Sequence, residues 1–421
     1  MIVLGFYIGL FILSFIVVRA VKRKRETGND LISRKTVTFG DESAIRPDRA
    51  ASVISLVSIF LIWGAFTGSH YVPVHVPGPF VGTLSFSYTA QNAAGATDSA
   101  VVQVLVHDAG VKPAPPEVSP GGGFAHDDAA TVPAWRSVLI KPVANDDGGA
   151  APGYRIIAID DQPIAPDQRV GVENGALVLT AKGSLNFQPR QGWQMEPIWL
   201  PSPEAVVARF FEIAANGYQN IPLWEHVGAS LMRVLAGFAL GSLVGIPLGY
   251  AMGLSGWFRG WFDPIVEFMR PVPPLALIPL VIIWFGIWET GKIVLLFLAA
   301  LWIMTIAARA GVSGVRITKI QAAYSLGASK WQIMRHVIIP NSLPEIFTGA
   351  RVAMGVCWGT VVAAELVAAQ KGAGMMIIAA SKFQLTDVVV MGIILIGIIG
   401  YGIDILMRIA ERVMVPWKGR E

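Results

Sequence analysis

Small, polar and cationic residues follow one another at defined spacing between Gln321 and Pro340, within a largely apolar part of the chain. The stretch reads QAAYSLGASKWQIMRHVIIP. No acidic residue occurs between Glu289 and Glu345, while basic residues gather there, so the positive-inside rule places this loop in the cytoplasm. The pattern predicts a docking surface.

A second residue that could have a chemical role is Glu365, in the segment VVAAELVAAQ. An ionisable residue in or near a membrane span is costly unless it lines a polar cavity or is paired. Three interpretations stay open for it: a transport pathway, a packed carboxylate bonded to a neighbouring helix, and a position at the outer interface.

The sequence contains no recognisable catalytic set. A nucleotide-binding GxxxxGK[ST] loop is absent and the six histidines are scattered, so we expect neither an enzyme nor a resident cofactor. Acidic and amide residues also cluster in the region after residue 123, a composition that is common in turns. These residues are Asp127, Asp128, Asn145, Asp146 and Asp147.

Composition indicates a polytopic membrane protein, because 53% of the 421 residues are hydrophobic and only 15% are charged. The basic residues flank apolar spans instead of forming a patch, which argues against nucleic-acid binding. Residues 71–200 carry twelve acidic and seven basic residues, about −5, so the overall +4 leaves about +9 for the remainder. An acidic external part and a basic cytoplasmic face follow.

Hydropathy predicts seven spans with the N-terminus outside and the C-terminus in the cytoplasm. An amphipathic helix is expected over 203–215, on the outer surface. The spans are expected at 2–18, 51–66, 226–253, 264–286, 292–312, 346–369 and 388–409. The span at 264–286 is expected to be irregular, because several prolines follow Arg270.

Glycine recurs at every fourth position of one predicted span, which creates a ridge where another helix can approach closely. The pattern fits packing within the subunit or an interface between subunits. The ridge consists of Gly237, Gly241, Gly245, Gly249 and Gly253.

Residues 70–199 change character, with frequent Pro and Gly and runs such as TLSFSYTA and AVVQVLVH that alternate with period two. They predict an extracytoplasmic β domain. Neither the segment before the Pro- and Gly-rich loop at 112–123 nor the segment after it has enough strands to bury two apolar faces. We therefore expect both to share one sandwich.

The loop described first resembles the EAA loop of ABC-importer permeases, in which two alanines precede a glycine and a proline at fixed spacing. Gln321 replaces the usual glutamate. The segments RPVPPLALIPLVIIWFGI, SLGASKWQ and AAELVAAQKGAG resemble the taurine, sulfonate and nitrate branch of that family. Gly82 to Val106 resembles the last strands of cadherin-like or immunoglobulin-like repeats, and Phe124 to Trp193 resembles their opening and middle, so the order is permuted. By analogy with cadherin-like modules, the acidic and amide cluster named above is a candidate for binding calcium. The residues of the coupling loop are Gln321, Ala322, Ala323, Gly327, Ala328, Ser329 and Pro340.

The resemblance implies a mainly α permease fold of about seven transmembrane helices in the bacterial inner membrane, with an inserted β sandwich. It also implies a second copy of the permease, an external solute-binding protein, and cytoplasmic ATPases that hold ATP and magnesium. The transported solute would be a small anion or zwitterion such as taurine or another alkanesulfonate. The expected domains are 1–50 (extra helix and basic linker), 51–69 (first permease helix), 70–199 (β sandwich) and 200–421 (permease core, with the coupling loop at 316–344).

Two other classes stay open on the sequence alone. One is a structural or sensory membrane protein whose β domain binds a partner. The other is an ion-driven secondary transporter, which is expected to have inverted repeats and several buried charges.

Overall fold

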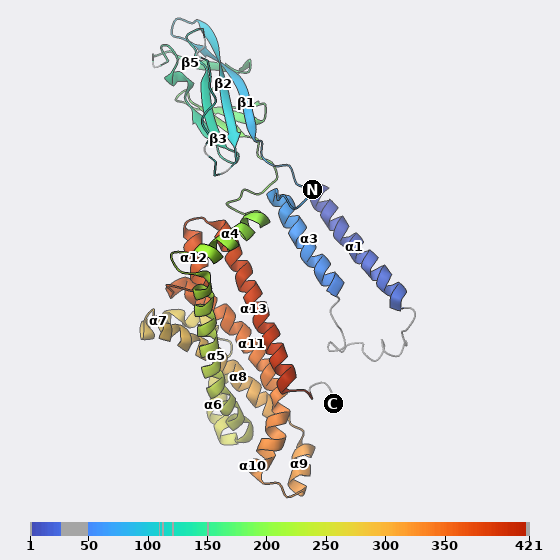
Figure 1. Ribbon diagram of the computed structural model, residues 1–421. Helices are drawn as coiled ribbons and strands as arrows, with labels where there is room; N and C mark the ends of the chain where they lie inside the picture. Colours follow the sequence, from blue (N-terminus) through green and yellow to red (C-terminus); the bar gives the residue numbers. More distant parts are fainter. Residues whose placement is uncertain are drawn as a thin grey trace. The chain divides into compact units, whose positions relative to one another are not determined.

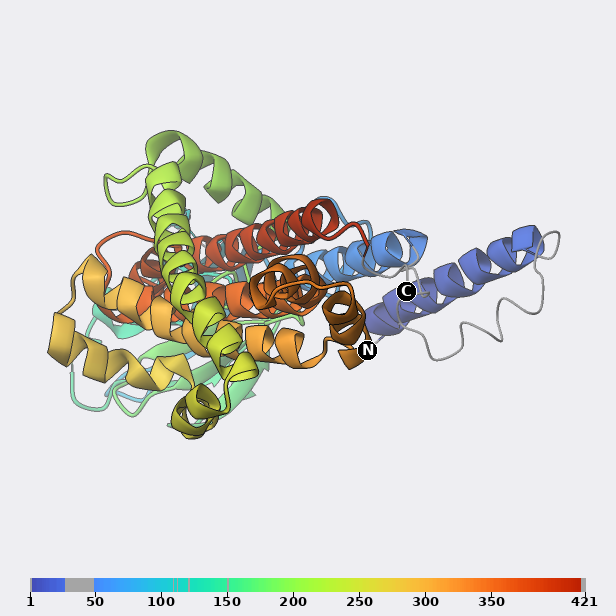
Figure 2. The same ribbon diagram turned by 90° about the horizontal axis from the view of Figure 1, so that it is seen from below.

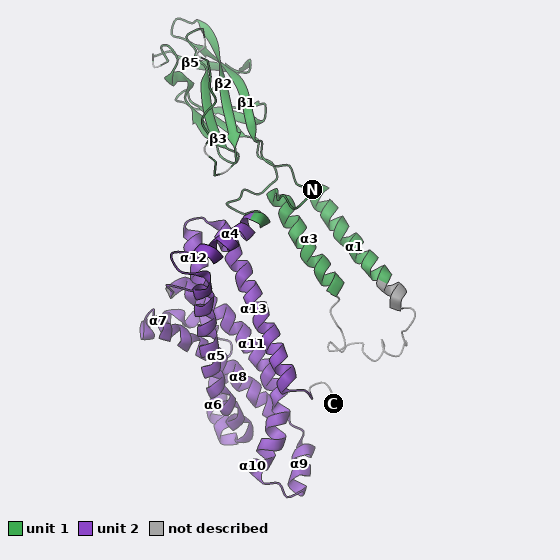
Figure 3. Ribbon diagram, in the orientation of Figure 1, with its two compact units in different colours: residues 1–204 green, residues 205–421 purple. Residues whose placement is uncertain are grey.

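The computed structural model describes residues 2–26, 49–108, 110–111, 113–119, 122–149 and 151–417. Most of the basic linker predicted within residues 1–50 lies outside these residues. The chain divides into two compact units, residues 1–204 and 205–421 (Figure 3).

Six helical segments of the described residues are long and apolar enough to cross a membrane, or up to seven if one bent pair is a single span. The prediction of about seven spans is confirmed in this form. The segments are α1 (Ile2–Glu26), α3 (Arg49–Thr67), α5 (Leu223–Leu254), α8 (Glu289–Ser313), Lys330–Val367 and α13 (Thr386–Met414). The amphipathic helix is α4 (Pro203–Asn216).

The span predicted over 264–286 is not one straight helix. The structure instead has α6 (Gly256–Met269), a short turn η3 (Pro274–Leu277) and α7 (Ile278–Phe285), with a bend of 91°. Pro271 and Pro273 lie at the break. Neither proline has an amide hydrogen to donate to the carbonyl four residues before it, so the helix ends at Met269.

The span predicted to begin at Ile346 begins much earlier. Helix α10 (Lys330–Ile333) continues through the π-helical turn η4 (Met334–Ile338) into α11 (Ile339–Ala368). Pro340 directly follows this π turn and has no amide hydrogen to donate to the preceding turn. The wider π turn lets the chain pass from α10 into α11 without a break.

The β strands of unit 1 form two sheets (Figure 1). One sheet has the order β3-β2-β1-β5-β6, and the other has the order β4-β9-β8-β7. The strands are β1 (Gly82–Gln91), β2 (Thr97–His107), β3 (Asp128–Pro133), β4 (Val138–Ile140), β5 (Arg155–Ile159), β6 (Gln162–Pro163), β7 (Arg169–Val172), β8 (Gly175–Leu179) and β9 (Leu185–Pro189).

Both halves of the β region build one core. β2 pairs with β3 in parallel, Val104 opposite Ala130, and β1 pairs with β5 antiparallel, Tyr88 opposite Ile159. Side chains alternate between buried and exposed along β1, and Phe86 stacks on Phe187 of the other sheet with ring centroids 6.0 Å apart. The prediction of a single shared sandwich is confirmed.

The sandwich is joined to α3 through two hydrogen-bonded connections. Val76 N donates to Ala65 O at 3.1 Å, and Met195 N donates to Phe66 O at 2.8 Å. Helix α1 also contributes, because the buried Tyr7 donates to Val74 O at 2.8 Å. Both ends of the insertion therefore meet at the end of α3.

In unit 2, α5, α8 and α11 run side by side (Figures 1 and 2). The glycine ridge of α5 faces α8. A Cβ atom at Gly237 would lie 2.3 Å from the Leu296 Cβ, and one at Gly249 would lie 2.4 Å from Thr305 O. Gly241, Gly245 and Gly253 show similar close approaches, to Phe297, Leu301 and Val312. This packing sets the distance between the helices that carry the site described below.

Candidate functional site

The first candidate site is the loop between α8 and α11. Helix α9 (Ile317–Ser325) ends in a turn at Gly327, whose φ is +81°. Ala328 N donates to Ala323 O at 3.1 Å across this turn. Glycine is favoured here because this backbone conformation is strained for most other residues.

Ser329 starts the second arm of the loop with a capping box. Its Oγ accepts from Gln332 N at 3.4 Å, and the Gln332 Oε1 accepts from Ser329 N at 2.8 Å. Lys319 of α9 donates to the Asn341 side chain of α11 at 2.7 Å, which ties the two arms together. The loop is therefore a defined helical hairpin.

The hairpin presents apolar side chains to solvent. Leu326 is 88% exposed, and Tyr324 and Trp331 are also exposed. Gln321 and Ala322 are exposed beside them, whereas Ala323 and Ala328 pack against the hydrophobic cluster that includes Tyr250 and Ile338. An exposed group of apolar and aromatic residues is typical of an interaction surface. Tyr324, Leu326 and Trp331 were not among the residues that the motif singled out, although their positions between motif residues could have drawn attention to them.

The second candidate site is built around Glu365 of α11, which is buried. Arg233 of α5, also buried, donates to its Oε1 at 2.5 Å. Ser230 Oγ donates to the same carboxylate at 2.8 Å, and Gly374 N donates at 3.0 Å. Because Ser230 contacts both carboxylate oxygens, Glu365 accepts four hydrogen bonds in all. Three come from α5 and one from the start of α12 (Ala373–Lys382).

Arg233 extends this network to α8. Its Nε and Nη2 donate to the two carboxylate oxygens of Glu289 at 2.5 and 2.7 Å. Its Nη1 also donates to Lys371 O at 2.8 Å. One guanidinium thus joins three helices and the α11–α12 connection, using the fork of donors that arginine provides.

Gly372 lets this connection lie directly against the carboxylate. Its φ is +145°, and an added Cβ would come within 2.3 Å of the Glu365 Cδ. The buried His226 ring lies 3.2 Å from both the nitrogen and the oxygen of Gly372. The sequence identified Glu365 but not its partners. A signal for Arg233 was available, since a cation within an apolar span must find an anion.

Beside this network lies a cavity of about 450 Å³, lined by side chains from α5, α8 and the α11–α12 connection. Glu225, Glu289, Lys292 and Lys371 contribute charges of both signs to it. A smaller apolar pocket adjoins it and shares Ile287, Trp288 and Lys292 with it.

Several of the candidate calcium ligands of the β domain are engaged by protein donors. Asp127 accepts from Val101 N at 2.8 Å, and its own carbonyl accepts from Asn145 Nδ2 at 3.2 Å. Asp146 accepts from His126 N and from the hydroxyls of Tyr88 and Tyr154. Burial, together with these bonds to Asp146, raises the pKa of both phenols.

Asp147 and Asp128 complete that group. Asp147 lies 3.6 Å from His126 Nε2. Burial, and then the negative charges of Asp146 and Asp127, raise the pKa of Asp128 to about 6. Among the described residues, no three His, Cys, Asp or Glu side chains are arranged to hold a metal ion.

Comparison with known proteins is consistent with this arrangement. Residues 237–415 match the family described as binding-protein-dependent transport system inner membrane component. The taurine transport system permease protein TauC of Escherichia coli K12 is 47% identical over 226 residues, which cover 53% of this chain and 82% of TauC. The putative aliphatic sulfonates transport permease protein SsuC of the same organism is 40% identical over 226 residues, which cover 54% of this chain and 84% of SsuC.

These matches confirm the resemblance inferred from the loop and the span sequences. With its apolar spanning helices, the protein is a multi-pass inner-membrane transport subunit and not an enzyme. The chain belongs to the family of binding-protein-dependent transport system inner membrane components, the permease subunits of ABC importers.

Proposed function

We propose that this permease forms the membrane pathway of an ATP-driven importer for taurine or a related alkanesulfonate. The identity of 47% to a taurine permease and 40% to an aliphatic sulfonate permease supports this substrate class. The predicted acidic exterior and basic cytoplasmic loops support an orientation with the N-terminus and β domain outside and the C-terminus inside.

The α9–α10 hairpin is the surface that couples the permease to a separate cytoplasmic ATPase, which binds ATP and magnesium. The observation that carries this proposal is the defined turn at Gly327 with Tyr324, Leu326 and Trp331 exposed around it. A groove on the ATPase would cover these side chains. The full transporter would also contain a second copy of this chain and an external binding protein that delivers the solute.

Gly327→Val tests the coupling role in the reconstituted complex. A β-branched residue is strained at this φ, so the turn should rearrange and the hairpin should lose its fit to the ATPase. We expect taurine uptake to fall at least tenfold while the yield of membrane-inserted protein stays the same. Gly327→Asn is the matched control, because asparagine tolerates left-handed backbone, and it should retain most uptake. Full uptake and full substrate-stimulated ATP hydrolysis in Gly327→Val would contradict the coupling role.

The substrate class is tested separately with the unaltered complex. Labelled taurine and an alkanesulfonate are offered to proteoliposomes that contain the permease, its ATPase and its binding protein. ATP-dependent uptake of at least one of them is expected. Uptake of neither, in a complex whose ATPase is active, would refute the proposed substrate class.

The extracytoplasmic β domain is proposed to be a cadherin-like or immunoglobulin-like module that contacts the binding protein. Its shared core and its hydrogen-bonded connections to α3 support a rigid docking module. Deletion of residues 78–192 with a short linker in their place should weaken binding of the loaded binding protein to the complex without preventing membrane insertion. Unchanged binding in such a variant would argue against the docking role.

A further inference from the structure

The cavity beside Glu289 combines charges of opposite sign within unit 2. Lys292 and Lys371 supply ammonium groups, and Glu225 and Glu289 supply carboxylates. A cavity lined by both signs suits a ligand that itself carries both signs. A simple anion that takes Lys371 would leave Glu225 without its cation.

The charges differ in how firmly they are paired. Glu289 accepts from Arg233 at 2.5 and 2.7 Å and from Lys292 at 3.1 Å. Lys371 lies 3.9 Å from Glu225, too far for a direct hydrogen bond, and both side chains are partly exposed. An exposed ion pair of this kind contributes little to stability. Lys371 and Glu225 can therefore separate and each bind a ligand instead at low cost in free energy.

Lys292 offers a second cationic contact. Its side chain is only 6% exposed, yet among the described residues its ammonium donates one hydrogen bond, to Glu289. An ammonium group has three donors. Glu289 keeps its two bonds from Arg233 if an anion takes the remaining donors of Lys292.

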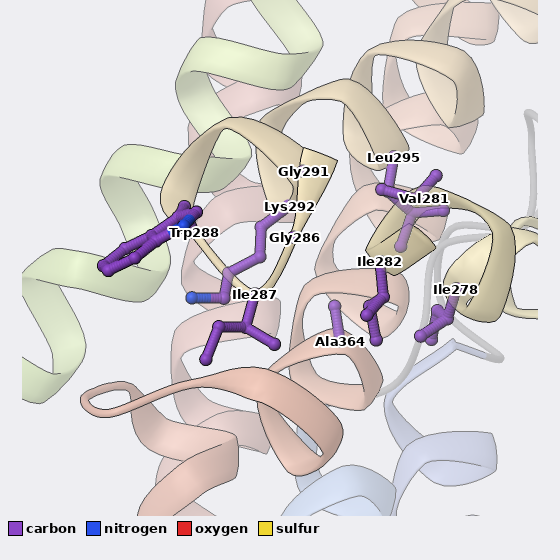
Figure 4. A pocket seen from close by; sticks show the side chains of 10 residues that line it. All are labelled: Ile278, Val281, Ile282, Gly286, Ile287, Trp288, Gly291, Lys292, Leu295 and Ala364. Carbon is purple, nitrogen blue, oxygen red and sulfur yellow. The ribbon is translucent and has the colours of Figure 1, made fainter. Parts of the chain in front are cut away.

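Figure 4 shows the apolar pocket, which shares Ile287, Trp288 and Lys292 with the charged cavity. The Lys292 side chain runs between Trp288 and Ile287, and its nitrogen points away from Ile278 and Val281. The charged end of a ligand would therefore lie near the nitrogen, and a short carbon chain would lie against Ile287 and Trp288.

We propose that this cavity is a binding site for a small zwitterion of the aminoalkanesulfonate class. The sulfonate accepts from Lys292 and Lys371, the ammonium donates to Glu225, and the methylenes contact Ile287 and Trp288. This inference rests on the proposed substrate class and adds that the permease itself selects for the amino group. The ligand replaces one loose ion pair by two closer ones, which an alkanesulfonate without an amino group cannot do.

The test measures binding to the full chain in lipid nanodiscs by ligand-observed NMR. The two probes are taurine and ethanesulfonate, which has the same carbon chain but no ammonium group. Glu225→Gln should weaken taurine binding about fivefold, the factor that corresponds to ~1 kcal/mol, and leave ethanesulfonate binding unchanged. Lys371→Gln should weaken binding of both probes about fivefold. Lys382→Gln removes an exposed cation that does not line the cavity, and it should change neither.

Two results would overturn the inference: no detectable taurine binding to the unaltered chain, or equal losses for both probes in Glu225→Gln. Taurine uptake by the complete transporter is measured in parallel. Uptake combined with either of those results would leave the proposed function in place and remove only this site. A complex that takes up neither taurine nor alkanesulfonates would instead refute the proposed function.

Discussion

Arg233 on α5 and Glu365 on α11 form a buried ion pair at 2.5 Å, 132 residues apart in the sequence. The same arginine holds Glu289 of α8, so one side chain fixes the mutual position of three helices. In a membrane protein an unpaired charge at such a position is costly. The position of Glu365 favours the packing interpretation over the interfacial one, since the carboxylate is buried and faces α5.

Removing Arg233 alone should be worse than removing Arg233 and the charge of Glu365 together, because Arg233 keeps Glu289 as a partner but Glu365 has no second cation. Arg233→Met leaves the Glu365 carboxylate buried without its cation and should destabilise the protein by about 3–5 kcal/mol. Arg233→Met with Glu365→Gln removes both charges and should recover part of that loss. The measurement is the fraction of full-length protein that remains monodisperse in detergent after heating. A double variant no more stable than Arg233→Met would contradict this compensation.

The contact between α5 and α8 yields a second prediction. Gly249→Val places a branched side chain where the Cβ alone would be 2.4 Å from Thr305 O, so α8 must move away. We expect a severe loss of folded protein, because overpacking a core in this way costs about 1–3 kcal/mol of stability or more. Gly228→Val on the same helix is the matched control, because nothing lies within 4 Å of its Cβ position. Equal yields of the two variants in membranes would show that the ridge is not a close contact.

Local features of the fold were predictable, whereas among long-range features only the shared sandwich was predicted. Period-two alternation identified β1 and β2, and spacing of four identified the glycine ridge, because both patterns depend on neighbours in the sequence. The partners of Glu365 come from distant helices, and no local pattern pairs Arg233 with it. The bend near Arg270 was foreseeable as irregular from its prolines, but its angle depends on packing. The start of the long helix at Lys330 depended on a π turn, for which the sequence carries no simple signal.

The β domain should fold without the membrane part. Residues 71–197 contain both sheets and the core in which Phe86 meets Phe187. We expect this fragment to be a monomer with a cooperative unfolding transition. Hydrogen exchange should protect the amides of β1 and β5, because these strands pair across the two halves of the domain. Protection confined to the segment after residue 123 would contradict a shared core.

The stability of that fragment should depend on pH through Asp128. Its pKa is raised to about 6 in the folded domain from an ordinary value of 3.8, so between these values the folded state binds more protons than the unfolded state. The stabilisation is therefore complete below pH 4 and is lost as the pH rises through 6. After allowance for partial contact with water, the loss is about 1–2 kcal/mol. Urea unfolding at pH 4.5 and 7.5 measures this loss. Variants are needed to separate the contribution of Asp128 from that of the other titrating groups.

Asp128→Asn removes this titration, so the variant should lose less stability between the two pH values than the unaltered fragment. Asp161→Asn, in an exposed turn, keeps Asp128 and should keep the loss. The comparison isolates Asp128, because contributions from all other carboxyl groups are shared by the unaltered fragment and the Asp128→Asn variant. The contrary result would be an equal loss of unfolding free energy between pH 4.5 and 7.5 in Asp128→Asn and in the unaltered fragment. Asp128 would then not be the protonated group, and the nearby charges of Asp146 and Asp127 would have no effect on stability through it.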